Sequence, residues 1–219
     1  MTGAPGVVRL WAASGLARDE PAPLVVVHDG PDYAGRGRLV RFLAAGVTAR
    51  RLPPLRAALL AAPERDDWYS ANDGYAGALA RAVSGLAPAT RRVGVGASLG
   101  ALAMLHAQRR HPAAFDALLL QSGSFFQPRL DGQESGFAYW SRVTGFVAEV
   151  LAAGGAPRPV PVAMTCGADE ENLANNREMA AALAAQGHPV TFAEVPGGHD
   201  YDSWRPAVRP PLTGLLAGS

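Results

Sequence analysis

One short segment constrains the fold of this chain more than any other. The segment GASLG at residues 96–100 fits the pattern G-x-S-x-G and joins an apolar run, Arg92–Gly96, to the helix-prone stretch Leu99–His111. Its glycines allow a strand to turn sharply into a helix with the serine at the apex. Chance alone would supply the pattern in roughly one chain in eight of this composition. The setting between strand and helix makes Ser98 a candidate nucleophile.

The rest of the chain alternates short apolar runs with longer helical segments. Seven runs have the composition of strands: Val7–Ala12, Leu24–His28, Leu55–Ala61, Arg92–Gly96, Ala117–Gln121, Pro161–Cys166 and Val190–Val195. Six segments between them favour helices: Leu39–Ala45, Asp73–Leu86, Leu99–His111, Phe137–Ala153, Asn172–Gln186 and Trp204–Leu216. This alternation predicts a mostly parallel sheet covered by helices on both faces, a three-layer α/β fold. We expect one domain over residues 1–219.

Composition narrows the classes of partner. The formal net charge of +1 gives no sign of a nucleic-acid or anionic-membrane partner. The single cysteine, Cys166, lies in an apolar run, so we expect a buried strand residue and no intramolecular disulfide. The sequence shows no signal-peptide pattern, and no apolar stretch approaches the roughly 20 residues that cross a bilayer. We therefore expect a cytoplasmic protein without nucleic-acid, membrane, cofactor or metal binding.

A nucleophilic serine needs a base, and the order of the strands sorts the five histidines. Functional groups of a parallel sheet gather beyond the carboxyl ends of its strands. His199 follows the last expected strand and lies at that edge, whereas His188 precedes the strand and lies at the other. His28 precedes the serine in the chain, and His106 and His111 lie on the helix after it, pointing away. We therefore predict that His199 is the base.

The acid that orients the base should follow the expected strand Pro161–Cys166. Three consecutive carboxylates stand there: Asp169, Glu170 and Glu171. They cannot all face one histidine, and a helix expected near Asn172 would also favour acids in its first turn. The residues themselves favour Glu170, with Asp169 as the second choice.

An ester-cleaving site would also need donors for an oxyanion. The N–H of Leu99, at the start of the helix after Ser98, is well placed to be one. The second donor should come from the loop after an early central strand, which here contains Gly30, Pro31 and Asp32. Asp-Gly-Pro is also strong turn chemistry, so a simple turn is the plainer interpretation.

Two loop-rich stretches, Pro63–Asp73 and Gly123–Ser135, are candidates to cover a substrate pocket. Aromatic residues near them are candidates to line it, although each is as readily a core residue. We predict substrate contacts chiefly for Tyr33, Trp68 and Phe125, among a wider set of Tyr33, Trp68, Tyr69, Phe125, Phe126, Tyr139 and Trp140.

Several motifs in order, HDGPDY, GASLGALAMLHAQRRHP, LLLQSGSFF, CGADEENLANN and PGGHDYDSWR, resemble the enterochelin-esterase-like branch of the esterase D superfamily. The resemblance runs from about Leu24 to the C-terminus. It implies an α/β-hydrolase fold and ester hydrolysis by a Ser–acid–His triad containing Ser98 and His199. In this branch the acid stands three residues after the glycine, which selects Glu170. The D-G-x-x-aromatic loop of the branch matches Asp29, Gly30 and Tyr33.

The sequence departs from the branch in two ways. Pro31 follows Gly30 and has no N–H, so the second oxyanion donor is expected from a neighbour such as Asp32. The additional N-terminal domain of siderophore esterases is not in this sequence, which counts against a ferric-siderophore trilactone as the substrate, and we expect a small-molecule ester. An acyltransferase with the same triad and a non-catalytic binding protein are the competing hypotheses, and a homodimer is left open.

Overall fold

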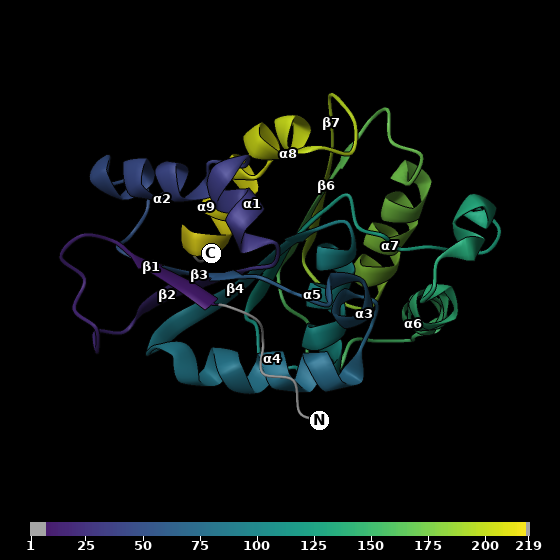
Figure 1. Ribbon diagram of the computed structural model, residues 1–219, viewed down its shortest axis with the longest axis horizontal. Coiled ribbons are helices and arrows are strands. Elements are labelled where there is room, and N and C mark those ends of the chain that lie inside the picture. Colours follow the sequence, from purple (N-terminus) through teal and green to yellow (C-terminus); the bar gives the residue numbers. More distant parts are fainter. Residues whose placement is uncertain (1–7, 218–219) are drawn as a thin grey trace.

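Within residues 8–217, the part of the chain that this computed structural model describes, seven strands form one sheet (Figure 1). The strands are β1 (Val8–Ala12), β2 (Ala22–Val27), β3 (Arg56–Leu60), β4 (Ala89–Ala97), β5 (Ala117–Gln121), β6 (Val162–Gly167) and β7 (Val190–Val195). Their spatial order is β1-β3-β2-β4-β5-β6-β7. Only β1 runs antiparallel to its neighbour, β3. The carboxyl ends of the parallel strands therefore share one edge.

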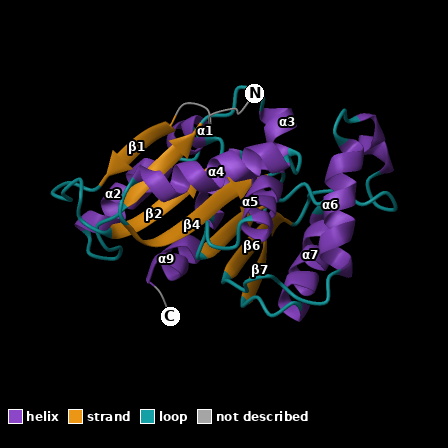
Figure 2. Ribbon diagram, turned by 90° about the horizontal axis from the view of Figure 1, so that it is seen from below, coloured by secondary structure: helices purple, strands orange, loops and turns teal. Residues whose placement is uncertain are grey.

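Helices cover both faces of the sheet (Figure 2). One apolar cluster contains residues of α4 (Asp73–Leu86), α5 (Leu99–Arg110), α6 (Trp140–Ala152) and α7 (Leu173–Ala185). The other contains residues of α1 (Gly30–Gly35), α2 (Leu39–Thr48), α8 (Tyr201–Ala207) and α9 (Arg209–Ala217). Two short helices complete the described elements, α3 (Arg65–Tyr69) and the 3₁₀ helix η1 (Gly132–Gly136). The inner strands β3 and β5 are buried along their whole length, because helices lie on both faces of the sheet.

The strand predictions are confirmed, with ends that differ by at most three residues. Val7, the first residue of the first expected strand, lies outside the described residues. The three-layer arrangement is also as expected. Within residues 8–217, no helix is both long and apolar enough to pass through a bilayer.

The helix prediction fails near the C-terminus, where one expected helix over Trp204–Leu216 is two. The side chain of Asp200 accepts hydrogen bonds from the N–H groups of Asp202 and Ser203, so α8 begins at Tyr201. Pro206 and the pair at residues 210 and 211 lack N–H groups, and a proline disfavours helix geometry in the residue before it. Because residues 210 and 211 have no N–H, the carbonyls of residues 206 and 207 lack their usual helical donors, and α8 ends at Ala207.

The sequence prediction also missed α1 and α3. Turn chemistry at residues 29–31 concealed α1, in which Pro31 stands in the first turn and needs no N–H partner. The stretch Pro63–Asp73, expected as a loop, contains α3, with Asp66 and Asp67 in its first turn. Both helices are too short to show a hydrophobic period.

Candidate active site

Ser98 lies at the apex of the turn from β4 into α5, with φ 56° and ψ −129°. A positive φ is strained for a residue with a Cβ, and such strain gathers at functional sites. A Cβ on Gly96 would overlap the backbone carbonyl of Gly100, and a Cβ on Gly100 would lie 3.2 Å from Cβ of His28. Strand and helix therefore approach so closely that Gly96 has no room for a side chain, and a side chain at Gly100 would be crowded by His28.

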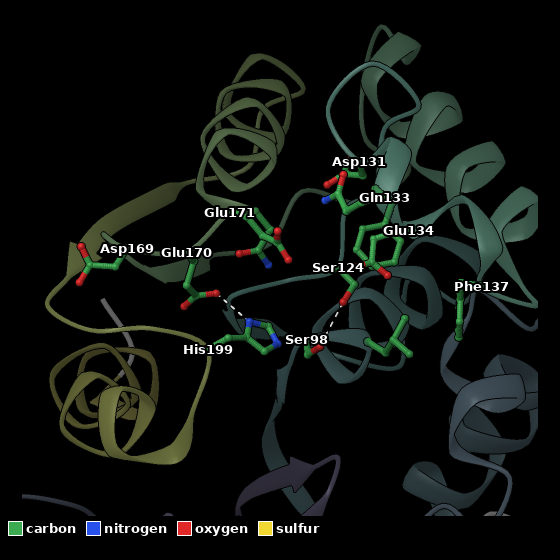
Figure 3. A pocket seen from close by; sticks show the side chains of 13 residues that line it. Ser98, Ser124, Asp131, Gln133, Glu134, Phe137, Asp169, Glu170, Glu171 and His199 are labelled. Carbon is green, nitrogen blue, oxygen red and sulfur yellow. Dashed lines mark hydrogen bonds and ion pairs between the residues drawn. The ribbon is translucent and has the colours of Figure 1, made fainter.

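Ser98 lines a cavity of about 540 Å³ at the carboxyl edge of the sheet (Figure 3). The other lining residues are Leu99, Ser124, Phe126, Asp131, Gln133, Glu134, Phe137, Asp169, Glu170, Glu171, Asn172 and His199. The three residues predicted as nucleophile, base and acid are thus brought to one cavity from β4, β6 and β7. The stretch Gly123–Ser135 supplies much of one wall, whereas Pro63–Asp73 supplies none of the lining residues.

His199 and Glu170 form the hydrogen-bonded pair of this cavity. Nδ1 of His199 lies 2.7 Å from Oε2 of Glu170. The Glu170 side chain is 1% exposed, whereas that of His199 is 43% exposed. The imidazole is therefore anchored at one nitrogen by a buried carboxylate, and its other nitrogen is left on the open side, next to Ser98 in Figure 3.

Hydrogen-bond donors around Glu170 stabilise its ionised carboxylate. Burial acts to raise the pKa of Glu170, but hydrogen bonds from His199, from Ser122 and from the N–H of Gly167 outweigh burial and lower it below its usual range. The Oγ of Ser122 donates to Oε1 at 2.6 Å, and the Gly167 N–H donates to the same oxygen at 2.8 Å. Glu170 is therefore an ionised buried acid, with Oε2 reserved for His199.

Asp169 and Glu171 lie beside Glu170 and also line the cavity, but both are exposed at its rim. The hydrogen bond to His199 comes from Glu170. The choice that the sequence left between Glu170 and Asp169 is therefore decided geometrically in favour of Glu170 as the partner of His199.

Ser98 is not paired with His199 in this structure. Its Oγ lies 3.1 Å from Oγ of Ser124, its recorded side-chain partner within residues 8–217. Hydrogen bonds between nucleophile and base are often long in enzymes without substrate, and they tighten when substrate binds. Ser124 was not among the residues predicted from the sequence, although its position just after β5, at the functional edge of the sheet, was a usable signal.

Only one of the three predicted oxyanion residues lines the cavity. Leu99 is the first residue of α5, where N–H groups have no partner within the helix. Gly30 and Asp32 lie in the first turn of α1 and do not line the cavity. A Cβ on Gly30 would lie 2.5 Å from the backbone of Leu59, so glycine is needed there for the close packing of α1 on β3.

The predicted substrate contacts of Tyr33, Trp68 and Phe125 need correction, because none of the three lines the cavity. Tyr33 is buried and donates to Gln121 at 2.9 Å, and Phe125 is buried in the core. Trp68 stacks on Tyr75 with ring centroids 5.4 Å apart. The aromatic residues of the wall are instead Phe126, which was in the wider predicted set, and Phe137, which was not.

Two of the other histidines, His28 and His188, have structural partners. Nδ1 of His28 lies 2.9 Å from the carbonyl of Gly100, and Nε2 lies 2.8 Å from the hydroxyl of Tyr75. His188 bonds to the backbone of Val160 at the opposite edge of the sheet. Across the described residues, no group of three His, Cys, Asp or Glu side chains is arranged to hold a metal ion. These histidines therefore do not compete with His199.

Comparison with known proteins gives this site a context. Residues 78–213 match the model of the family described as "Putative esterase". The iron(III) enterobactin esterase of Dickeya dadantii (strain 3937) is 30% identical over 233 residues, which cover 96% of this chain and 52% of that protein. This chain thus spans about half the length of the curated relatives it matches.

Solved structures agree with this match. The enterobactin esterase of Shigella flexneri, crystallised with enterobactin, has a TM-score of 0.80 and 25% identity, covering 96% of this chain and 54% of that one. A ferulic acid esterase has a TM-score of 0.73 at 18% identity, covering 96% of this chain and 91% of that one. These likenesses confirm the expected α/β-hydrolase fold.

Proposed function

Because this chain belongs to the esterase family, in its enterochelin-esterase-like branch, we propose that it hydrolyses a small-molecule carboxylic ester through an acyl-enzyme on Ser98. One observation carries the proposal: a buried, ionised carboxylate anchors Nδ1 of His199 in the same cavity that holds the strained Ser98. This is the arrangement that a serine nucleophile requires.

In the first step, Nε2 of His199 takes the hydroxyl proton while Oγ of Ser98 attacks the ester carbonyl. Glu170 holds the imidazole in the tautomer with the proton on Nδ1 and stabilises the imidazolium that forms. His199 then gives its proton to the departing alkoxide, and the alcohol leaves. In the second step His199 activates a water molecule, which attacks the acyl carbon and releases the acid and free Ser98.

The charge that develops on the carbonyl oxygen needs donors on the α5 side of the cavity. We assign one to the N–H of Leu99. We assign the second to the first turn of α1, where Pro31 has no N–H and leaves the amides of Gly30 and Asp32. This turn lies near the elbow, since a Cβ on Gly100 would lie 3.4 Å from Oδ2 of Asp29, but Gly30 and Asp32 do not line the cavity, so the N–H of Leu99 is the better supported donor.

The substrate class follows from the cavity rather than from the relatives. The relatives named as iron(III) enterobactin esterases are about twice the length of this chain, so their substrate is not carried over. The lining of this cavity includes the rings of Phe126 and Phe137 next to several carboxylates. A volume of about 540 Å³ suits a small ester with an apolar portion.

A p-nitrophenyl ester series of increasing acyl length tests the proposal. The wild-type protein should release p-nitrophenol, and Ser98→Ala should lower kcat/KM at least about 10³-fold. Ser84→Ala, which removes an exposed hydroxyl on α4, serves as the matched control. A fluorophosphonate should label the wild type and not Ser98→Ala. Equal rates for the wild type and Ser98→Ala would refute the proposal.

A further inference from the structure

Ser122 is a buried hydroxyl group that the reaction steps above do not use. It directly follows β5, is 0% exposed, and has φ 46°. Serine at a positive φ is strained, and such a conformation persists where the surroundings fix it. The backbone N–H of Ser122 donates to the carbonyl of Thr165 on β6 at 2.7 Å. The residue is therefore held firmly in an unfavourable conformation.

The hydroxyl of Ser122 lies between two side chains, and its direction is fixed by their chemistry. Nε1 of Trp204 lies 2.9 Å from the Oγ, and an indole N–H can only donate. The Oγ therefore accepts from Trp204, and its single proton points to Oε1 of Glu170 at 2.6 Å. Trp204 also packs edge-on against His199, with ring centroids 5.0 Å apart.

Two asparagines hold the segment that carries this hydroxyl: Asn172, the N-cap of α7, and Asn176, within α7. Asn176 accepts from the N–H of Gly123 at 2.9 Å and donates to its carbonyl at 3.0 Å. Asn172 donates to the carbonyl of Ser122 at 3.1 Å. Ser124, two residues after Ser122, contacts Ser98, so one short segment touches Glu170 through Ser122 and Ser98 through Ser124.

We propose that Ser122 is a positioning residue that fixes Glu170 for its work on His199. A carboxylate can rotate about its last bond and offer either oxygen. With Ser122 and the Gly167 N–H both on Oε1, rotation is opposed and Oε2 stays directed at Nδ1 of His199. This role rests on the proposed function, and it assigns Ser122 no contact with substrate.

The test replaces Ser122 by alanine and measures kcat, KM and the pH profile of kcat/KM. Ser122→Ala should lower kcat about tenfold with KM within about twofold, since a hydrogen bond to a charged group is lost. The acid limb of the profile should move up by about one pH unit. A carboxylate that loses a hydrogen-bond donor binds a proton more tightly, so the apparent pKa of the coupled Glu170–His199 pair should rise.

Two further variants keep the test sharp. Ser122→Gly removes the hydroxyl and also the strain of a positive φ, so it should fold even if Ser122→Ala does not, and it should show the same shift of the acid limb. Thr165→Val removes a buried hydroxyl that bonds to Gln121 and to no member of the proposed triad, and its profile should match the wild type. A folded Ser122→Ala or Ser122→Gly with an unchanged kcat and acid limb would overturn the proposal.

A spectroscopic measurement separates this proposal from the proposed function. The Nδ1 proton of His199 should give a far-downfield proton NMR signal whose position reports its bond to Glu170. In Ser122→Gly that signal should shift or exchange faster, and this readout needs no turnover. If Ser98→Ala kept full activity while the signal still responded to Ser122, the assignment of the nucleophile would fail and that of Ser122 would stand. A signal identical to the wild type would refute the role of Ser122.

Discussion

Residues 8–217 contain two histidine–carboxylate pairs, and they are built in opposite ways. In the first, Glu170 is 1% exposed and His199 is 43% exposed, with a distance of 2.7 Å between Nδ1 and Oε2. In the second, His106 is 2% exposed and Asp73 is 77% exposed, with 3.0 Å between Nε2 and Oδ1. The contacts are similar in length, but the buried partner is the acid in one pair and the base in the other.

This difference decides what each imidazole can do. Burial of Glu170 among donors keeps a charge next to Nδ1 of His199 and leaves the ring open to the cavity. Burial of His106, which packs edge-on against Phe146, lowers its pKa to about 4 even though Asp73 acts to raise it. His106 is therefore neutral at pH 7 and packed on helix α5. Of the two histidines, the one that lines the cavity is therefore the one whose carboxylate partner is buried.

The largest expected effect comes from replacing the two histidines one at a time. His199→Ala should lower kcat/KM for a p-nitrophenyl ester by about 10⁴-fold, because the serine loses its proton acceptor. His106→Phe keeps a ring against Phe146 and should leave kcat/KM within about twofold. Steady-state kinetics on both variants give the comparison. A loss of similar size in His106→Phe would show that the two pairs are not distinct in function.

The next largest effect concerns the acid. Glu170→Gln retains the shape of the side chain but cannot compensate the imidazolium, and an amide can favour the wrong tautomer, so kcat should fall by about 10³-fold. The neighbouring variant Asp169→Asn is the matched control and should change kcat less than about threefold. If Asp169→Asn were the more damaging change, the acid would be Asp169.

The pair of His106 and Asp73 should affect the free energy of unfolding rather than the rate of ester hydrolysis. The folded-state pKa of His106 is about 4, below its unfolded value of 6.5, so only the unfolded chain takes up a proton between these values. The stability contribution is present above pH 6.5 and is lost as the pH falls toward 4, on the order of 3 kcal/mol for the full span. Urea unfolding at several pH values measures it.

His106→Phe cannot take up this proton, so its stability should fall less steeply between pH 6.5 and 4. Some slope should remain, because burial also lowers the pKa of His28 to about 4. Parallel curves for the wild type and His106→Phe would show that His106 does not titrate as its burial implies.

The smallest expected effect concerns the open side of His199. The lining there includes the carboxylates Asp131, Glu134, Asp169 and Glu171, with no arginine among the lining residues described. An ester that carries a carboxylate should react about tenfold more slowly than a neutral ester of the same shape, and less so at high salt, because exposed charges are screened. Glu134→Gln should narrow the gap. An anionic ester that reacted faster would contradict this electrostatic preference.

The sequence predicted the regular part of the fold well, because each prediction rested on local chemistry. Apolar runs of five to seven residues marked the strands, and the last one, Val190–Val195, agrees residue by residue with β7. Helices α1 and α3 were missed because a segment of five or six residues carries too little periodicity. The aromatic residues of the cavity were hard to predict for a related reason: a loop position does not say whether Phe125 or Phe126 faces the cavity and which of them packs into the core.

By itself the sequence determined the elbow at Ser98, the order in which serine, acid and histidine follow their strands, and the edge of the sheet on which His199 lies. These follow from glycine geometry and from the alternation of strands and helices, which act over a few residues. Only the tertiary structure decided which carboxylate meets His199 and that Ser122 and Trp204 support it. The paired residues are far apart in the sequence: 29 positions for His199 and Glu170, 48 for Ser122 and Glu170, and 82 for Trp204 and Ser122. Only the packing of remote segments brings them together.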